Sequence, residues 1–128
     1  DPFRVTEARK RMALDNIAHL LGGFLDDEGY ENVIFCWVMD RQEIIDAVLV
    51  PLAGKEFELF SFSLVCGPGT LESRLRRDVD AGLRTPDVIG RSLERLPLYG
   101  ALDTEKIGTE GLSAAGAAQE IARRVAGE

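Results

Sequence analysis

The sequence has few of the residue types from which hydrolytic and metal-binding sites are built. Among 128 residues there are one histidine and two cysteines. His19 has no obvious serine or cysteine partner for a nucleophilic triad, and the spacing of Cys36 and Cys66 fits no metal-binding motif. We therefore expect no hydrolytic triad and no metal-ligating residues. The two thiols are expected to be reduced and buried in the core of a cytoplasmic protein.

Long apolar runs and an excess of positive charge are also missing. The longest apolar run, residues 33–39, is far shorter than the roughly 20 residues of a transmembrane helix. No signal-peptide pattern is present in the sequence. The chain has 15 basic and 22 acidic residues, which gives a net charge of −7. We expect neither a membrane nor a nucleic acid as a partner.

Helix and strand patterns alternate along the chain. Helical periodicity covers residues 6–25, with Thr6 as the expected N-cap. The apolar run at 33–39 predicts a strand that is buried on both faces, and residues 57–66 predict a second strand. Residues 67–70 predict a turn. The remaining expected elements are helices at 40–49, 71–81, 87–96 and 113–125, and a short last strand at 104–107.

This order of elements predicts an α/β fold. Alternation of strands and helices favours a three-layer sandwich, in which a parallel sheet lies between layers of helices. Three strands are few for such a sheet, which usually has about five. We therefore expect that further strands precede residue 1.

Arginine is concentrated in one segment of this acidic chain. Arginine forks bind phosphate through paired hydrogen bonds and stabilise the charge of a phosphoryl group in transfer. The alternative is a solvated helix face with ion pairs four residues apart, such as Asp87 with Arg91. Six of the 15 basic residues form this group: Arg74, Arg76, Arg77, Arg84, Arg91 and Arg95.

Asp40 follows the first predicted strand directly, and Arg41 comes next. Ligands of open α/β sheets bind outside the carboxyl ends of the strands. At this position Asp40 could hold Mg²⁺ through water or orient a substrate hydroxyl, and Arg41 could contact a substrate phosphate. Asp40 could equally cap the helix that follows. No phosphate loop of the form G-x-x-x-x-G-K-[ST] occurs in the sequence.

Several of these segments together resemble the adenylate-kinase-like P-loop kinases, and more closely a bacterial group of small AAA-type predicted nucleotide kinases. The segments are Leu-x-x-Arg-Leu at 71–75, the lid-like stretch 82–89, Arg-Leu-x-x-Tyr at 95–99 and the strand and loop at 106–113. The resemblance covers essentially the whole chain. It implies one P-loop kinase-like domain over residues 1–128, with a lid at about 82–99. It also implies a sheet of order 2-3-1-4-5, of which strands 3, 4 and 5 are present here.

The resemblance also implies roles for individual residues. Arg84 and Arg95 would be catalytic and would bind the phosphoryl group in transfer. Arg74 would lie against the adenine of ATP. The loop formed by Gly108, Thr109 and Glu110 would meet the edge of the adenine.

The acceptor side of the implied site would be formed by Asp1, Asp40 and Arg41. The implied cofactors are ATP and Mg²⁺, and the implied partners are ATP and a small-molecule substrate. The sequence identifies neither the phosphoryl acceptor nor the oligomeric state.

The resemblance implies an ATP-dependent phosphotransferase, a small-molecule or nucleotide kinase that transfers the γ-phosphoryl group to a hydroxyl or phosphate acceptor. The phosphate loop would lie upstream or on another chain, and these 128 residues alone would be inactive. The alternative is a noncatalytic α/β module that binds a nucleotide or a partner protein through its arginines.

Overall fold

The computed structural model describes residues 4–128, so the expected acceptor residue Asp1 lies outside the described residues. The chain forms two compact units. The first ends at Leu59, and the second runs from Phe60 to Glu128. Each unit is described by itself.

The first unit begins with the long helix α1 (Glu7–Asp26). The Thr6 hydroxyl caps it by accepting a hydrogen bond from the Arg9 N–H at 3.1 Å, which confirms the predicted N-cap. At the other end, Lys55 Nζ donates to both carboxylate oxygens of Asp26, at 2.7 and 2.8 Å. This ion pair ties the end of α1 to the loop that follows the second helix of the unit.

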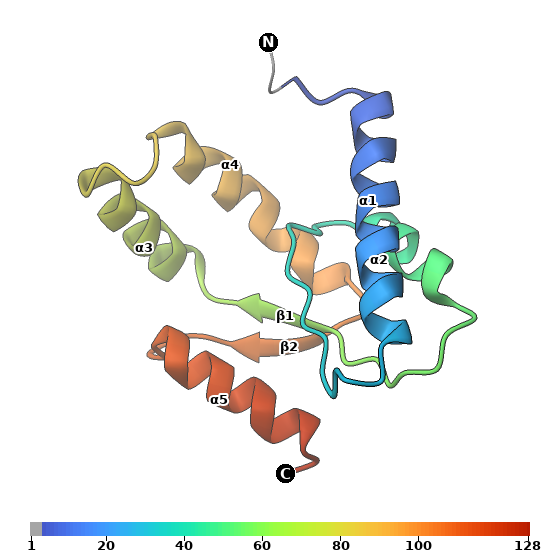
Figure 1. Cartoon of the computed structure of the whole chain (residues 1–128). Coiled ribbons are helices and arrows are strands. Elements are labelled where there is room, and N and C mark those ends of the chain that lie inside the picture. Colours follow the sequence, from blue (N-terminus) through green and yellow to red (C-terminus); the bar gives the residue numbers. More distant parts are fainter. Residues whose placement is uncertain (1–3) are drawn as a thin grey trace. The chain divides into compact units, whose positions relative to one another are not determined.

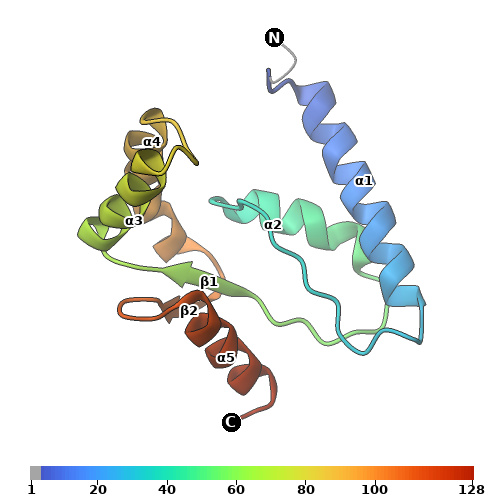
Figure 2. The same ribbon diagram turned by 60° about the vertical axis from the view of Figure 1, so that its left-hand side comes forward.

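A second helix, α2 (Gln42–Leu49), continues into the short 3₁₀ helix η1 (Val50–Leu52), and both contact α1 (Figure 2). The N-cap of α2 is Arg41, one residue after Asp40, for which capping was one of two alternatives. Burial of apolar side chains between these helices stabilises the unit. The buried side chains are Ile45, Val48 and Leu52.

The predicted strand at 33–39 is absent. Residues 32–40 instead form an extended segment that does not pair with a neighbouring strand. A strand requires a neighbouring strand for its backbone hydrogen bonds, and the described residues provide none for this segment. Several of its apolar side chains are exposed, with Ile34 92% exposed, whereas Val33, Phe35 and Met39 are half-buried. Cys36 is also exposed and Cys66 is half-buried, so the prediction of two core thiols is wrong.

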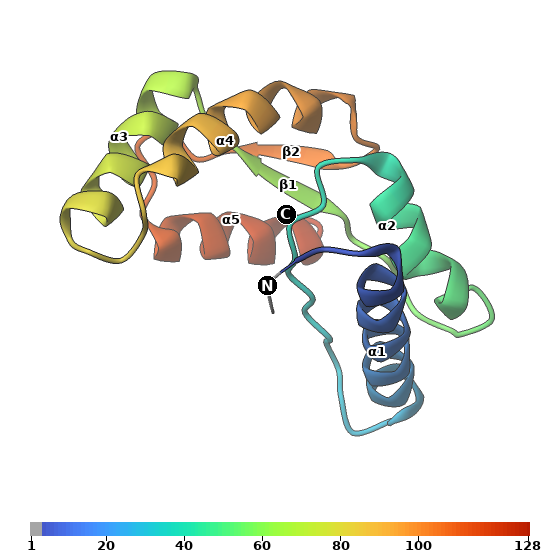
Figure 3. The same ribbon diagram turned by 90° about the horizontal axis from the view of Figure 1, so that it is seen from above.

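The second unit is built around two short parallel strands, β1 (Phe62–Val65) and β2 (Glu105–Gly108), paired in register from Phe62↔Glu105 to Val65↔Gly108. Between them the chain forms α3 (Pro68–Asp80), α4 (Asp87–Arg95) and the 3₁₀ helix η2 (Leu96–Ala101). The last helix is α5 (Ala114–Val125). Figures 1 and 3 show α4 and α5 on opposite sides of the strand pair.

Local sequence determines how the helices of the second unit begin and end. Pro68 occupies the first turn of α3, so residues 67–70 start a helix and the predicted turn there is wrong. Gly82, with φ of +76°, follows α3. The N–H of Leu83 bonds to the carbonyl of Asp78, and that of Gly82 to the carbonyl of Val79. These two bonds form a Schellman motif, which a glycine in the left-handed region favours.

The predicted fold class is wrong. The described residues are mostly helical and contain two short parallel strands, so they form no three-layer sandwich and no sheet of order 2-3-1-4-5. The apolar run at 33–39 was interpreted as a strand although it has no ladder partner. The run at 57–66 has ladder pairing only at Phe62–Val65. Apolar composition alone does not provide the partner that a strand requires.

Candidate functional site

The carboxyl ends of β1 and β2 bring together three of the predicted adenine-side residues. Arg74 Nη1 donates to Thr109 Oγ1 at 2.8 Å, and its Nη2 donates to the carbonyl oxygen of Thr109 at 2.7 Å. Thr109 is itself buried, and its N–H donates to the Val65 carbonyl at 2.8 Å. The guanidinium of Arg74 is thus held at two points beside the tips of both strands.

Glu110 is bound on the same edge, at the beginning of α3. Its Oε1 accepts a hydrogen bond from the Gly67 N–H, and its Oε2 accepts one from the Thr70 hydroxyl, both at 2.5 Å. These hydrogen bonds, with that of Thr70 the larger cause, lower the pKa of the Glu110 carboxyl below its usual range. The carboxylate also lies at the helix end that favours negative charge. We call Arg74, Thr109, Glu110, Thr70 and Gly67 the strand-end cluster.

The strand-end cluster positions a flat cationic group. Because two hydrogen bonds fix the plane of the Arg74 guanidinium, its faces are oriented without further ordering of the side chain. A guanidinium face stacks well on an aromatic ring. Gly108 is exposed at the end of β2, and a Cβ atom there would meet nothing within 4 Å. A planar ring could therefore approach the backbone of this loop.

The two predicted catalytic arginines are not brought together. Arg84 lies in the turn between α3 and α4, where its Nε donates to Asp78 Oδ2 at 3.2 Å. Arg95 is the last residue of α4. The helix between them has nine residues and is therefore about 13 Å long. Arg84 thus lies before α4 and Arg95 at its last residue.

Arg91 belongs to the arginine group that was considered for phosphate binding, with a solvated ion pair to Asp87 as the alternative, and it lies in α4 near Arg84. The predicted pair is present, with Arg91 Nη2 3.0 Å from Asp87 Oδ2. The two arginines also line an open hollow of about 410 Å³, which we call the hairpin hollow. Its lining residues are Gly82, Leu83, Arg84, Thr85, Val88 and Arg91. Arg84 and Arg91 are seven residues apart, and α4 begins between them. This spacing is the signal in the sequence that could have indicated that the two arginines lie close together.

The expected acceptor residues Asp40 and Arg41 belong to the first unit. Asp40 ends the extended segment, and Arg41 precedes the first turn of α2. They lie in a different unit from the strand-end cluster and the hairpin hollow.

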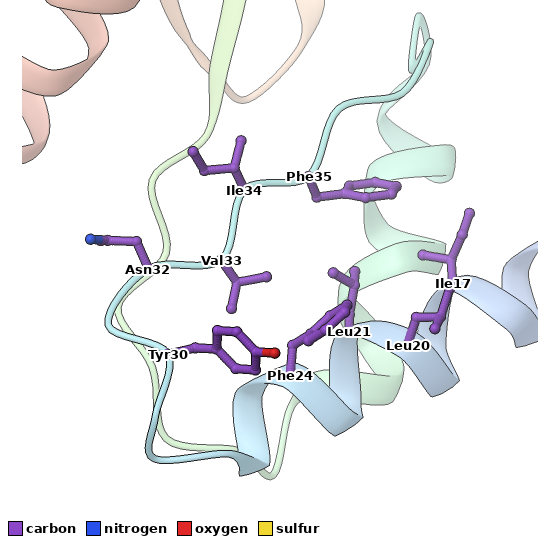
Figure 4. A pocket seen from close by; sticks show the side chains of 9 residues that line it. All are labelled: Ile17, Leu20, Leu21, Phe24, Tyr30, Asn32, Val33, Ile34 and Phe35. Carbon is purple, nitrogen blue, oxygen red and sulfur yellow. The ribbon is translucent and has the colours of Figure 1, made fainter.

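The first unit contains an apolar hollow of about 330 Å³ between α1 and the segment that follows it (Figure 4). The rings of Phe24 and Tyr30 meet edge to face there, with centroids 5.3 Å apart. Asn32 is the only amide side chain on its wall, and no charged side chain lines it. The lining residues are Ile17, Leu20, Leu21, Phe24, Tyr30, Asn32, Val33, Ile34 and Phe35. Because no charged side chain lines it, this hollow is no candidate for phosphate chemistry.

No family model, curated protein or solved structure matches the chain. Over residues 4–128, no group of three or more His, Cys, Asp or Glu side chains is placed to hold a metal ion. No helix in that part of the chain has the length and apolar character required to cross a membrane.

Proposed function

We propose that this chain binds ATP at the strand-end cluster and takes part in ATP-dependent phosphoryl transfer to a small hydroxyl or phosphate acceptor. The observation that carries the proposal is the double hydrogen bond from Arg74 to Thr109, 35 residues away in the sequence. It lies at the carboxyl ends of adjacent parallel strands, where α/β proteins bind their ligands.

In this proposal the adenine stacks on the guanidinium of Arg74, and the backbone at Gly108 and Glu110 meets its edge. Mg²⁺ would arrive bound to the triphosphate. Mg²⁺ would neutralise charge on the phosphates, and we assign it no protein ligand. The exposed thiol of Cys36 is compatible with a reducing compartment, and we propose that the protein is cytoplasmic.

Isothermal titration of the 128-residue chain with ATP and Mg²⁺ tests the proposal. We expect saturable binding with a Kd below about 1 mM, which corresponds to about −4 kcal/mol. Arg74→Ala should weaken binding by about tenfold, because it removes both the stacking face and the tether of the loop. Arg76→Ala is the matched control on the same helix, since among the described residues Arg76 pairs with Glu72 alone, at 3.0 Å. Equal effects of the two substitutions, or no binding by the unmodified chain, would contradict the proposal.

A noncatalytic nucleotide-binding module is the second candidate. The observation that favours it is that Arg84 lies in the turn before α4, hydrogen-bonded to Asp78, whereas Arg95 is the last residue of that helix. Transfer of labelled γ-phosphate to a panel of small hydroxyl and phosphate compounds distinguishes the two candidates. Binding that depends on Arg74, without transfer to any acceptor, would support the module and contradict the phosphotransferase.

A further inference from the structure

We propose that the hairpin hollow is a phosphate subsite, in which Arg84 and Arg91 together bind a phosphoryl group after it displaces the carboxylates of Asp78 and Asp87. This inference deepens the proposed function and rests on it for the ligand, the terminal phosphates of a nucleotide. The sequence placed Arg91 in a group of six arginines, and the structure pairs it specifically with Arg84 in one hollow.

The shape of the turn brings the side chains of Arg84 and Arg91 to the same hollow. The Schellman motif at Gly82 reverses the chain after α3, and α4 starts five residues later at Asp87. Arg84 thus lies before α4 and Arg91 in its second turn. Both line the same hollow of about 410 Å³, which is large enough for a phosphate group with its water.

Each arginine of the hollow is held loosely. Arg84 is bonded through Nε alone, and no other hydrogen bond of its side chain is found within residues 4–128. Arg91 contacts a single carboxylate, that of Asp87. The side chains of Arg84 and Arg91 are 52% and 59% exposed. Exposed pairs of this kind contribute little to stability, so exchanging a carboxylate for a phosphate does not disrupt the fold.

A phosphate has the advantage over the carboxylates because it can use both forks at once. Arginine forms paired hydrogen bonds to phosphate oxygens through its fork. One phosphoryl group between two forks can accept four such bonds, whereas each aspartate now occupies one arginine. Asp78 and Asp87 oppose binding through their charge. The Thr85 hydroxyl bonds to Asp87 and lowers the pKa of that carboxyl, which keeps it ionised near neutral pH.

This competition gives the subsite a distinctive signature. Removing an arginine should weaken phosphate binding, and neutralising its aspartate should strengthen it. Arg76 provides a matched control, because its pair with Glu72 has the same 3.0 Å contact and the same 59% exposure as that of Arg91. Arg76 is absent from the lining of the hollow.

The test is isothermal titration of the 128-residue chain with inorganic pyrophosphate at low ionic strength, where charge interactions are least screened. We expect Arg84→Ala and Arg91→Ala each to weaken binding by about tenfold or more. Arg91→Lys, which keeps the charge but loses the fork, should also weaken it. Asp87→Asn and Asp78→Asn should each tighten binding several-fold, and Arg76→Ala should change it less than about twofold. Circular dichroism confirms that each variant is folded.

Two results would overturn the inference. One is the absence of pyrophosphate binding, and the other is an effect of Arg91→Ala no larger than that of Arg76→Ala. A different result would contradict the proposed function, namely ATP binding whose affinity is unchanged by Arg74→Ala. Pyrophosphate binding that depends on Arg84 and Arg91 but not on Arg74 supports the subsite whether or not ATP binds at the strand-end cluster.

Discussion

Leu64 and Ile107 are register partners in the parallel strand pair, yet Leu64 is 53% exposed and Ile107 only 1%. Paired residues of parallel strands extend to the same face of a sheet. The face is therefore covered over β2 and largely open over β1. The core of the second unit is centred on β2.

The first prediction concerns this difference in burial. Ile107→Ala should lower the free energy of unfolding by about 3 kcal/mol, because it removes buried methyl groups and leaves a cavity. Leu64→Ala, the matched substitution on the neighbouring strand, should lower it by less than about 1 kcal/mol. Urea denaturation followed by circular dichroism measures both changes. Similar losses for the two variants would show that Leu64 is buried as deeply as Ile107.

The second prediction concerns the Arg74 tether. Arg74→Lys keeps the positive charge but cannot donate two coplanar hydrogen bonds to Thr109, so the loop at 109–112 should open more readily. Hydrogen exchange should become faster at Leu112, whose N–H donates to the Thr109 carbonyl at 3.0 Å. The control is Arg76→Lys, which leaves the tether intact. Unchanged exchange at Leu112 in Arg74→Lys would mean that the tether does not order the loop.

The third prediction concerns pH. Because hydrogen bonds from Thr70 and Gly67 lower the pKa of Glu110 in the folded chain, this group stabilises the fold above its ordinary pKa of 4.5. That contribution is lost as the pH falls through the lowered pKa of the folded state. Glu110→Gln should therefore destabilise the chain at pH 7 and have less effect in acid below both values.

The measurement is the midpoint temperature of thermal unfolding, for Glu110→Gln and for the unmodified chain, between pH 3 and pH 7. Thr70→Val, which removes the principal hydrogen bond to the carboxylate, should reproduce part of the same pH dependence. A difference between Glu110→Gln and the unmodified chain that stays constant over this range would contradict the assignment.

The fourth prediction concerns the turn that shapes the hairpin hollow. Gly82→Ala should destabilise the chain by about 1 kcal/mol, because a Cβ is disfavoured at φ of +76°. Gly90→Ala is the matched control inside α4, where a Cβ meets nothing within 4 Å. That substitution should stabilise by up to about 1 kcal/mol, since alanine favours the helix. Thermal unfolding should show a lower midpoint temperature for Gly82→Ala and a higher one for Gly90→Ala. Shifts of the same sign would contradict the role given to the turn.

The sequence by itself determined the helices and most of their ends. Thr6 caps α1, Ser113 caps α5 by accepting from the Gly116 N–H at 3.0 Å, and Gly82 ends α3, each through interactions within a few residues. Such contacts are local, so the order of residues is sufficient to predict them.

Only the tertiary structure decided which apolar runs are strands and which polar residues meet. Residues 33–39 and 57–66 are both rich in apolar side chains, and both were predicted to be strands. Within them only Phe62–Val65 pairs with a neighbouring strand. The resemblance assigned Arg74 and Thr109 to the same adenine, whereas the two hydrogen bonds between them and the neighbourhood of Arg84 and Arg91 appear only in the structure. The physical reason is that ladder pairing and side-chain contacts join residues far apart in the chain, and composition and periodicity carry no information about such distances.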